Sequence, residues 1–250
     1  MLYQTNKIDK LAFVKDIVKQ DYRAATVFRR YGIDFCCGAS STLEMACLIR
    51  NLDLETIQKE LAKATRSVYI SNTLQYEEWE PDFLIDYIVH VHHSYLKIVL
   101  PELLATFPTF VESHRKKYSF LPELLSTFAD LAKEMLSHIS QEEEIIFPYI
   151  KQIFYAYKDK EPYGSLLVRT LSKPVADVMK HEHDFVVKAL ERMRILSNDY
   201  VLPPDACTNY RANILTLQEI DDDITQHLHL ENNILFPKAI EMEGKLRGKI

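Results

Sequence analysis

One eleven-residue phrase occurs twice in the chain and constrains its fold more than any other feature. The first copy, HISQEEEIIFP, covers residues 138–148, and the second, HLHLENNILFP, covers residues 227–237. Each copy places a histidine four residues before a glutamate, which puts both side chains on one face of a helix. The helical rows through these pairs are otherwise apolar: Phe128, Leu131, Met135 and Ile145 in the first copy, and Leu217, Ile220, Ile224 and Ile234 in the second. Each His–Glu pair is therefore expected on a buried face.

A buried carboxylate requires a cation or hydrogen-bond donors, because burying it alone is costly. Two helices of this kind bring His138, Glu142, His227 and Glu231 into one core. Two imidazoles and two carboxylates in one core indicate a metal site. Glu143 and Glu144 lie off the buried row and are expected to contribute little to it.

Composition favours helices over sheet. The 250 residues include only five glycines, and 47% of the chain is hydrophobic. A net charge of −6 argues against nucleic acid and against an anionic membrane surface as partners. No stretch approaches the roughly 20 apolar residues that span a bilayer, and the N-terminus lacks a signal-peptide pattern, so a cytoplasmic location is expected. The four cysteines are expected to be thiols.

The helical patterns divide the chain into a small helical domain (residues 1–66), a linker (67–81) and a bundle (82–250). The small domain is expected to contain helices near 8–18, 24–31, 43–50 and 54–65. The bundle is expected to contain four long helices near 82–107, 121–157, 163–197 and 207–243. Pro101 would kink the first long helix or lie near its end, and Pro174 would lie in the opening turns of the third. The prediction is an all-α fold with an up-down four-helix bundle.

The internal repeat predicts that the first and third long helices also supply ligands. His183 shares an apolar row, whereas the row of His181 is polar. In the first helix His90 lies in a polar row, but His92 and His93 both lie in apolar rows. The distance to the following His–Glu phrase is nearly equal for His93 and His183, so His93 is chosen and His92 is the alternative.

Six candidate ligands exceed what a single tetrahedral zinc accepts. Mixed imidazole and carboxylate ligands suit iron or manganese, and two carboxylates between two metals act as bridges, together with an oxo or hydroxo group. Ferritin-like sites carry Glu-x-x-His, with the glutamate first and a spacing of three. Here the histidine comes first and the spacing is four, which favours a hemerythrin-like bundle.

The whole chain resembles the di-iron iron–sulfur cluster repair family, the repair of iron centres proteins. The resemblance rests on YGIDFCCG near the N-terminus and on VLPEL, SHISQEEEIIFP, EHD, PPDAC and HLHLENNILFP in the bundle. It implies a cytoplasmic protein with two non-haem irons that helps to restore clusters damaged by nitric oxide or peroxide. The ligands that the resemblance implies are His93, His138, Glu142, His183, His227 and Glu231.

The resemblance also points to two further pairs. The paired cysteines of the family fall on Cys36 and Cys37, which are interpreted either as packed core residues or as thiols for redox or iron-transfer chemistry. Glu134 and Glu182 match acidic positions near the site, either as a polar route to the metals or as charges on the helix surface.

The leading functional hypothesis is cluster repair by iron donation, by nitric oxide chemistry of a reductase type, or by both. Its partners would be damaged iron–sulfur proteins and nitric oxide or oxygen as small ligands. The alternative is a hemerythrin-like protein that binds or senses oxygen or nitric oxide, and an iron store or a structural metal bundle is a third hypothesis. The sequence leaves the oligomeric state open, a homodimer included.

Overall fold

The computed structural model describes residues 8–35, 41–65, 74–170 and 175–248, with side chains except at residues 169–182. All regular elements in these ranges are helices, beside one isolated antiparallel bridge between Phe13 and Thr42. The predicted all-α fold is thereby confirmed. None of the helices in the described ranges combines the length and the apolar content needed to cross a membrane.

The chain divides into two compact units. The first contains Met1–Ser71, Ala105–Leu121 and Ser197–Glu219, and the second contains Asn72–Leu104, Pro122–Leu196 and Ile220–Ile250. The candidate ligands lie in the second unit, which is therefore the unit that concerns function most.

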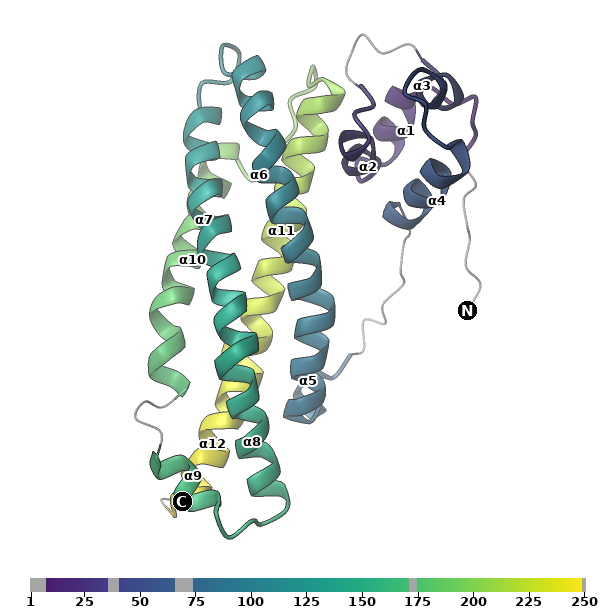
Figure 1. Ribbon diagram of the computed structural model, residues 1–250. Coiled ribbons are helices and arrows are strands. Elements are labelled where there is room, and N and C mark those ends of the chain that lie inside the picture. The colour runs from purple at the N-terminus through teal and green to yellow at the C-terminus, as the bar shows by residue number, and fades with distance from the viewer. Residues whose placement is uncertain (1–7, 36–40, 66–73, 171–174, 249–250) are drawn as a thin grey trace. The chain divides into compact units, whose positions relative to one another are not determined.

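Four short helices occupy the N-terminal part of the first unit (Figure 1): α1 (Val14–Gln20), α2 (Ala24–Arg30), α3 (Leu43–Ile49) and α4 (Leu54–Ala64). Side-chain caps define two of their starts, since Thr42 accepts a hydrogen bond from the backbone N–H of Met45 and Asp53 accepts one from that of Thr56. Gly32, at φ +66°, follows the end of α2. Helix α1 begins six residues later than the predicted residue 8.

Four helical rods lie side by side (Figure 1) and form the bundle, although residues 105–114 of the first rod and 208–219 of the fourth are assigned to the first unit. The first consists of α5 (Pro81–Tyr87), η2 (Ile88–His93) and α6 (Ser94–His114), and the second of α7 (Leu121–Gln141), η3 (Glu142–Ile146) and α8 (Phe147–Lys158). The third is α10 (Val175–Ser197), preceded by the short α9 (Gly164–Thr170). The fourth consists of α11 (Thr208–Leu230), η4 (Glu231–Leu235) and α12 (Phe236–Leu246). This is the predicted hemerythrin-like bundle arrangement.

The predicted end of the first long helix was wrong. The first rod continues through Pro101 to His114, because burial of Leu100, Leu103 and Phe107 stabilises the helix on both sides of the proline. Where a single third helix was expected over residues 163–197, the described residues form α9 and α10. Pro174, expected in its opening turns, lies outside the described residues.

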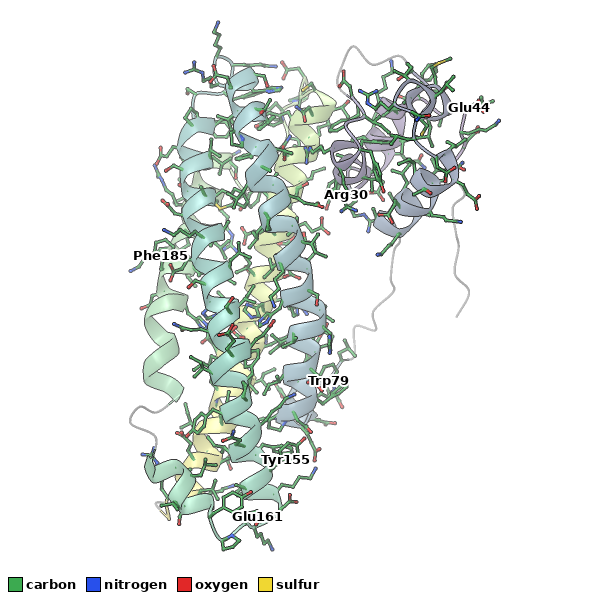
Figure 2. All side chains as sticks on the ribbon, viewed as in Figure 1. Arg30, Glu44, Trp79, Tyr155, Glu161 and Phe185 are labelled. Atoms are coloured by element: carbon green, nitrogen blue, oxygen red, sulfur yellow. The ribbon has the colours of Figure 1, made fainter. Side chains whose placement is uncertain are left out.

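The residues just before α5 pack onto the bundle. They form the short 3-10 helix η1 (Tyr76–Glu78), followed by Trp79 (Figure 2). The Trp79 ring contacts those of Tyr76, Phe83 and Tyr87 edge-on, with centroids 4.8–5.3 Å apart. The side chain of Lys238 donates hydrogen bonds to the backbone carbonyls of Glu77 and Trp79. These contacts fix the direction in which the first rod enters the bundle.

Candidate metal centre

All six predicted ligands project from the four rods into one region of the second unit. His93 ends η2, and His183 lies on α10. His138 lies near the end of α7 and Glu142 begins η3, while His227 and Glu231 occupy the equivalent places at the end of α11 and the start of η4. In each repeated phrase the histidine therefore lies in an α-helix and the glutamate begins the π turn that follows it.

Three of the four rods contain a π-helical turn at the ligands: η2, η3 and η4. A π turn adds a residue to the local repeat and often occurs at functional sites. One sequence expectation was wrong within η3. Ile145 is 60% exposed and Ile146 is buried in its place, whereas Ile234 in the second copy is buried as predicted.

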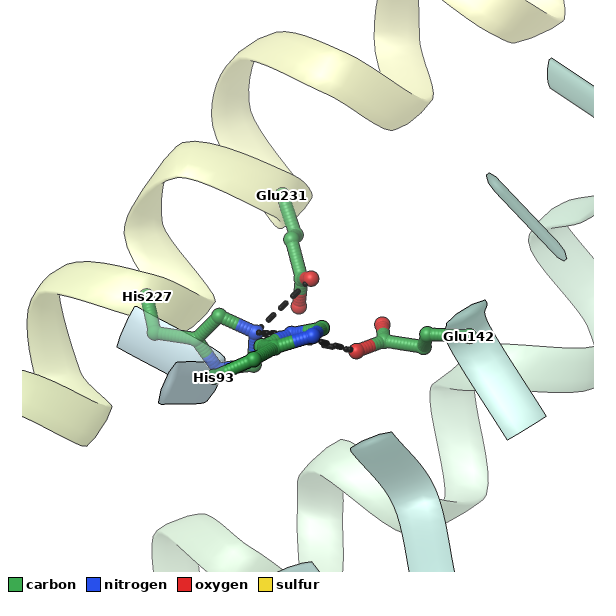
Figure 3. Close-up of side chains that lie close together, drawn as sticks. All are labelled: His93, Glu142, His227 and Glu231. Atoms are coloured by element: carbon green, nitrogen blue, oxygen red, sulfur yellow. Dashed lines mark hydrogen bonds and ion pairs between the residues drawn. The ribbon is translucent and has the colours of Figure 1, made fainter. Parts of the chain in front are cut away.

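The six side chains form two groups that share both glutamates. One group is His93, His227, Glu142 and Glu231, and the other is His138, His183, Glu142 and Glu231. Within each group the potential ligand atoms all lie within 4.8 Å of one another. Figure 3 shows the first group, in which the Glu142 and Glu231 carboxylates face the imidazoles of His93 and His227.

In each group the two imidazoles approach through their Nε2 atoms. The distance is 3.1 Å between His93 and His227 and 3.2 Å between His138 and His183. Nitrogen ligands about 2 Å from one ion lie roughly 3 Å apart when they occupy adjacent coordination positions. The paired Nε2 atoms therefore have a spacing suited to sharing a metal ion.

The carboxylates lie within ion-pair distance of the same nitrogens. Glu142 oxygens are 3.3 Å from His93 Nε2 and 3.2 Å from His138 Nε2. Glu231 oxygens are 2.9 Å from His227 Nε2 and 3.5 Å from His183 Nε2. Each glutamate thus contacts one histidine from each group, which is the arrangement required of a bridging ligand.

Burial makes this set of side chains electrostatically incomplete without cations. Glu142 and Glu231 are fully buried, and none of their carboxylate oxygens has a partner at hydrogen-bonding geometry among the described residues. Burial and the Glu142 carboxylate raise the pKa of Glu231 to about 7. For Glu142 burial acts in the same direction, but the imidazoles of His138, His227 and His93 outweigh it and hold the pKa well below its ordinary value.

Burial and neighbouring groups also set the pKa values of His227 and His183. Burial lowers the pKa of His227, but the carboxylates of Glu231 and Glu142 outweigh that effect and raise it to about 10. Burial, together with the neighbouring His138, lowers the pKa of His183. Two buried carboxylates beside four imidazoles are satisfied by bound cations, so the residues present fit a pair of metal ions.

A second layer of side chains holds two of the imidazoles, and the helical rows in the sequence did not indicate it. Nδ1 of His93 lies 2.9 Å from Glu143, whose carboxylate also accepts a hydrogen bond of 2.5 Å from Lys97 Nζ. Nδ1 of His183 lies 2.9 Å from Asn232 Oδ1. Glu143, which was expected to contribute little, contacts the candidate ligand His93 directly. Glu144 is exposed, as expected.

The alternative candidate His92 is buried but lies outside both groups. Its Nδ1 is 3.0 Å from Asp223 Oδ1, and its ring centroid is 6.0 Å from that of His227. His90 is exposed. The structure therefore brings His93 and not His92 to the centre, in agreement with the choice made from the repeat.

The other candidate residues are placed only in part. Glu134 lies on α7 one turn before His138 and is half-buried. The side chains of His181 and Glu182 lie outside the described residues, as do Cys36 and Cys37 altogether.

Comparison with known proteins identifies the family. Residues 11–65 match the family model ScdA_N, a domain of unknown function (DUF542), and residues 84–239 match the hemerythrin HHE cation binding domain. The chain is 34% identical over 224 residues to proteins named iron-sulfur cluster repair protein YtfE from Escherichia coli O17:K52:H18, Shigella boydii serotype 4 and Enterobacter sp. strain 638. Each alignment covers 88% of this chain and 93% of the relative. The chain belongs to this iron–sulfur cluster repair family, and its bundle is a hemerythrin HHE cation binding domain.

Proposed function

We propose that the chain holds two iron ions in its bundle and repairs iron–sulfur clusters damaged by nitrosative or oxidative stress. The observation that carries this proposal is the pair of four-residue groups that share Glu142 and Glu231. The names of the relatives, all iron–sulfur cluster repair proteins, support the repair role.

The ligand chemistry supports iron. His93 and His227 would hold one ion, His138 and His183 the other, and Glu142 and Glu231 would reach both. Imidazole and carboxylate donors suit iron, and six shared donors exceed one tetrahedral zinc. An oxo or hydroxo bridge between the ions is part of the proposal.

A carboxylate-bridged di-iron centre supplies redox chemistry, binding of nitric oxide or oxygen, and iron that can be passed to a damaged cluster. The residues of the chain do the remaining work. The buried apolar rows exclude bulk water, and Glu143 and Asn232 fix the Nδ1–H side of His93 and His183 so that each Nε2 lone pair faces the centre. Repair would proceed by iron donation, by nitric oxide chemistry, or by both.

The remaining parts of the chain have roles in the same proposal. Residues 1–66 form the small domain, 67–81 the linker and 82–250 the di-iron bundle. Cys36 and Cys37 would offer soft thiolate ligands for iron in transfer to a client. Glu134 and Glu182 would line a polar route to the centre. Damaged iron–sulfur proteins in the cytoplasm are the proposed clients.

The test is the recovery of a purified [4Fe–4S] dehydratase whose cluster has been destroyed by nitric oxide. Iron-loaded wild-type protein should restore its activity under anaerobic conditions, as should the control Glu144→Ala, whose side chain is exposed. Protein carrying Glu231→Ala should not. Equal recovery with all three proteins, or with free iron alone at the same concentration, would contradict the proposal. A stable, reversible oxygen complex without any recovery would favour the oxygen-binding alternative.

A further inference from the structure

His93 and His183 stand in equivalent surroundings on the two halves of the repeat. The ring of His93 stacks on Phe147, with centroids 5.5 Å apart and planes inclined by 12°. The ring of His183 stacks on Phe236, with centroids 5.9 Å apart and planes inclined by 26°. Phe147 and Phe236 occupy the same position of the repeated phrase, so the two rings are held in the same way.

The halves differ at the residue that follows the bridging glutamate. In the first copy this residue is Glu143, and in the second it is Asn232. Each lies 2.9 Å from Nδ1 of the histidine on the neighbouring rod, with an oxygen that accepts the Nδ1 proton. One imidazole therefore donates to an ionised carboxylate and its counterpart donates to a neutral amide.

The charge of the acceptor changes what the imidazole offers to a metal. A hydrogen bond to a carboxylate is charge-assisted and stronger than one to an amide. A carboxylate behind a histidine raises its basicity as a ligand, and such outer partners are worth roughly 10- to 100-fold in metal affinity. His93 is thus expected to be the stronger donor of the two.

Lys97 does not cancel this difference. Its ammonium pairs with Glu143 at 2.5 Å, but the lysine side chain is 44% exposed, so water screens its charge from the buried ring of His93. The pairing also restricts the carboxylate to the position in which it accepts from His93.

Burial differs in the same direction. The side chains of His93, His138 and His227 are completely buried, whereas that of His183 retains 6% exposure. The position held by His138 and His183 is therefore the more accessible of the two to an incoming chelating group.

Building on the proposed di-iron function, we propose that Glu143 and Asn232 make the two metal positions unequal. The position at His93 and His227 retains its iron, and the position at His138 and His183 is the one that gives iron up. Glu143 and Asn232 act as positioning residues, because each works through a histidine and neither is one of the six ligands. The class of acceptor that this arrangement serves is a thiolate-rich site that lacks one iron.

The experiment follows iron release from the full-length protein loaded anaerobically with 57Fe. A ferrous chelator in excess is added, and Mössbauer spectra are recorded as iron leaves. Glu143→Gln and Asn232→Asp each change one charge with little change in shape, so each should shift the quadrupole doublet of its own position and thereby identify it. Glu144→Gln and Asn233→Asp make the same charge changes at exposed neighbouring positions and should shift neither doublet.

In the wild type we expect iron to leave in two phases. The position at His138 and His183, whose doublet Asn232→Asp shifts, should lose its iron first. Glu143→Gln should speed the loss of iron from the position at His93 and His227 by roughly tenfold or more. Asn232→Asp should slow the loss of iron from the position at His138 and His183 by a similar factor. The double variant Glu143→Gln/Asn232→Asp places the carboxylate on the other half and should reverse the order of loss.

Release of both irons in a single phase would overturn the inference and leave the proposed function standing. Loss of iron first from the position at His93 and His227, whose doublet Glu143→Gln shifts, would also overturn the inference and leave the proposed function standing. Failure of the wild type to take up an iron pair would overturn the proposed function and, with it, this inference.

Discussion

At the scale of single residues, Glu142 and Glu231 are the side chains that join the two halves of the centre. Both are fully buried, and each lies within ion-pair distance of a histidine from each group. The raised pKa of Glu231, about 7, reflects burial and the repulsion between two carboxylates in one core. Cations placed between them would remove that repulsion.

Replacing either glutamate by alanine should therefore affect both metal ions. We expect Glu142→Ala and Glu231→Ala each to lower the affinity for iron by more than the roughly 10- to 100-fold that outer partners contribute, and to reduce the occupancy of both positions together. Metal analysis with Mössbauer spectroscopy measures this. The exposed Glu144→Ala serves as the control and should retain a full complement of iron. Loss of only one iron from both glutamate variants would show that the carboxylates do not bridge.

The candidate ligands could be predicted from sequence because each lies in an apolar helical row, where a charged or imidazole side chain is conspicuous. The repeat and the family resemblance separated His93 from His92, since both are buried. Glu143 could not be found in this way, because its side chain is partly exposed and its importance depends on a contact with His93 from another rod. The repeat did offer one indication, which is a polar residue after the glutamate in both copies.

At the scale of elements, the π turns η3 and η4 set the register of the second and fourth rods around the centre. Each begins at a glutamate, and each is followed by a phenylalanine and a proline, at Phe147–Pro148 and Phe236–Pro237. A proline lacks the N–H that an α-helix interior requires, and the first turn after a change of helix type tolerates it. The period of 3.6 residues cannot reveal a π turn; the expectation from that period was wrong for Ile145 in η3 and right for Ile234 in η4.

The π turn η3 leads to a prediction about stability: replacing Ile146 should destabilise the protein more than replacing Ile145, although the 3.6-residue period places Ile145 on the buried face. Ile146→Ala should lower the free energy of unfolding by about 2–5 kcal/mol, because it removes a buried side chain. Ile145→Ala should change it by no more than about 0.5 kcal/mol, because this side chain is 60% exposed. Urea unfolding of the metal-free proteins, followed by helical circular dichroism, gives both values. A larger loss for Ile145→Ala would indicate an ordinary α-helical register at this point.

At the scale of the whole molecule, the repeated phrase accounts for the pairing of the rods. Two copies of one helix pattern, each preceded by a histidine-bearing helix, form the second unit. The length of the first rod could not be predicted, because burial of its apolar face beyond Pro101 outweighs the local effect of the proline. Matches to two family models, over residues 11–65 and 84–239, agree with a chain that joins a small helical part to a cation-binding bundle.

The division of labour along the chain leads to a prediction about the thiols. All six proposed ligands lie beyond residue 82, so Cys36→Ser/Cys37→Ser should leave the iron content and the di-iron spectrum unchanged. The same variant should restore a nitric-oxide-damaged cluster enzyme more slowly than wild-type protein of equal iron loading, since serine is a poor ligand for iron. Cys47→Ser is the control, because Cys47 is a buried member of the core of the small helices. Equal recovery with the double-serine and wild-type proteins would assign the pair to packing.

The central claim is that the two groups around Glu142 and Glu231 bind a pair of iron ions. The most direct measurement is metal analysis and Mössbauer spectroscopy of protein purified anaerobically from cells supplied with both iron and zinc. We predict two irons per chain that are magnetically coupled to each other, as expected of ions joined by shared carboxylates. One zinc per chain without iron, or two irons without magnetic coupling, would contradict the account.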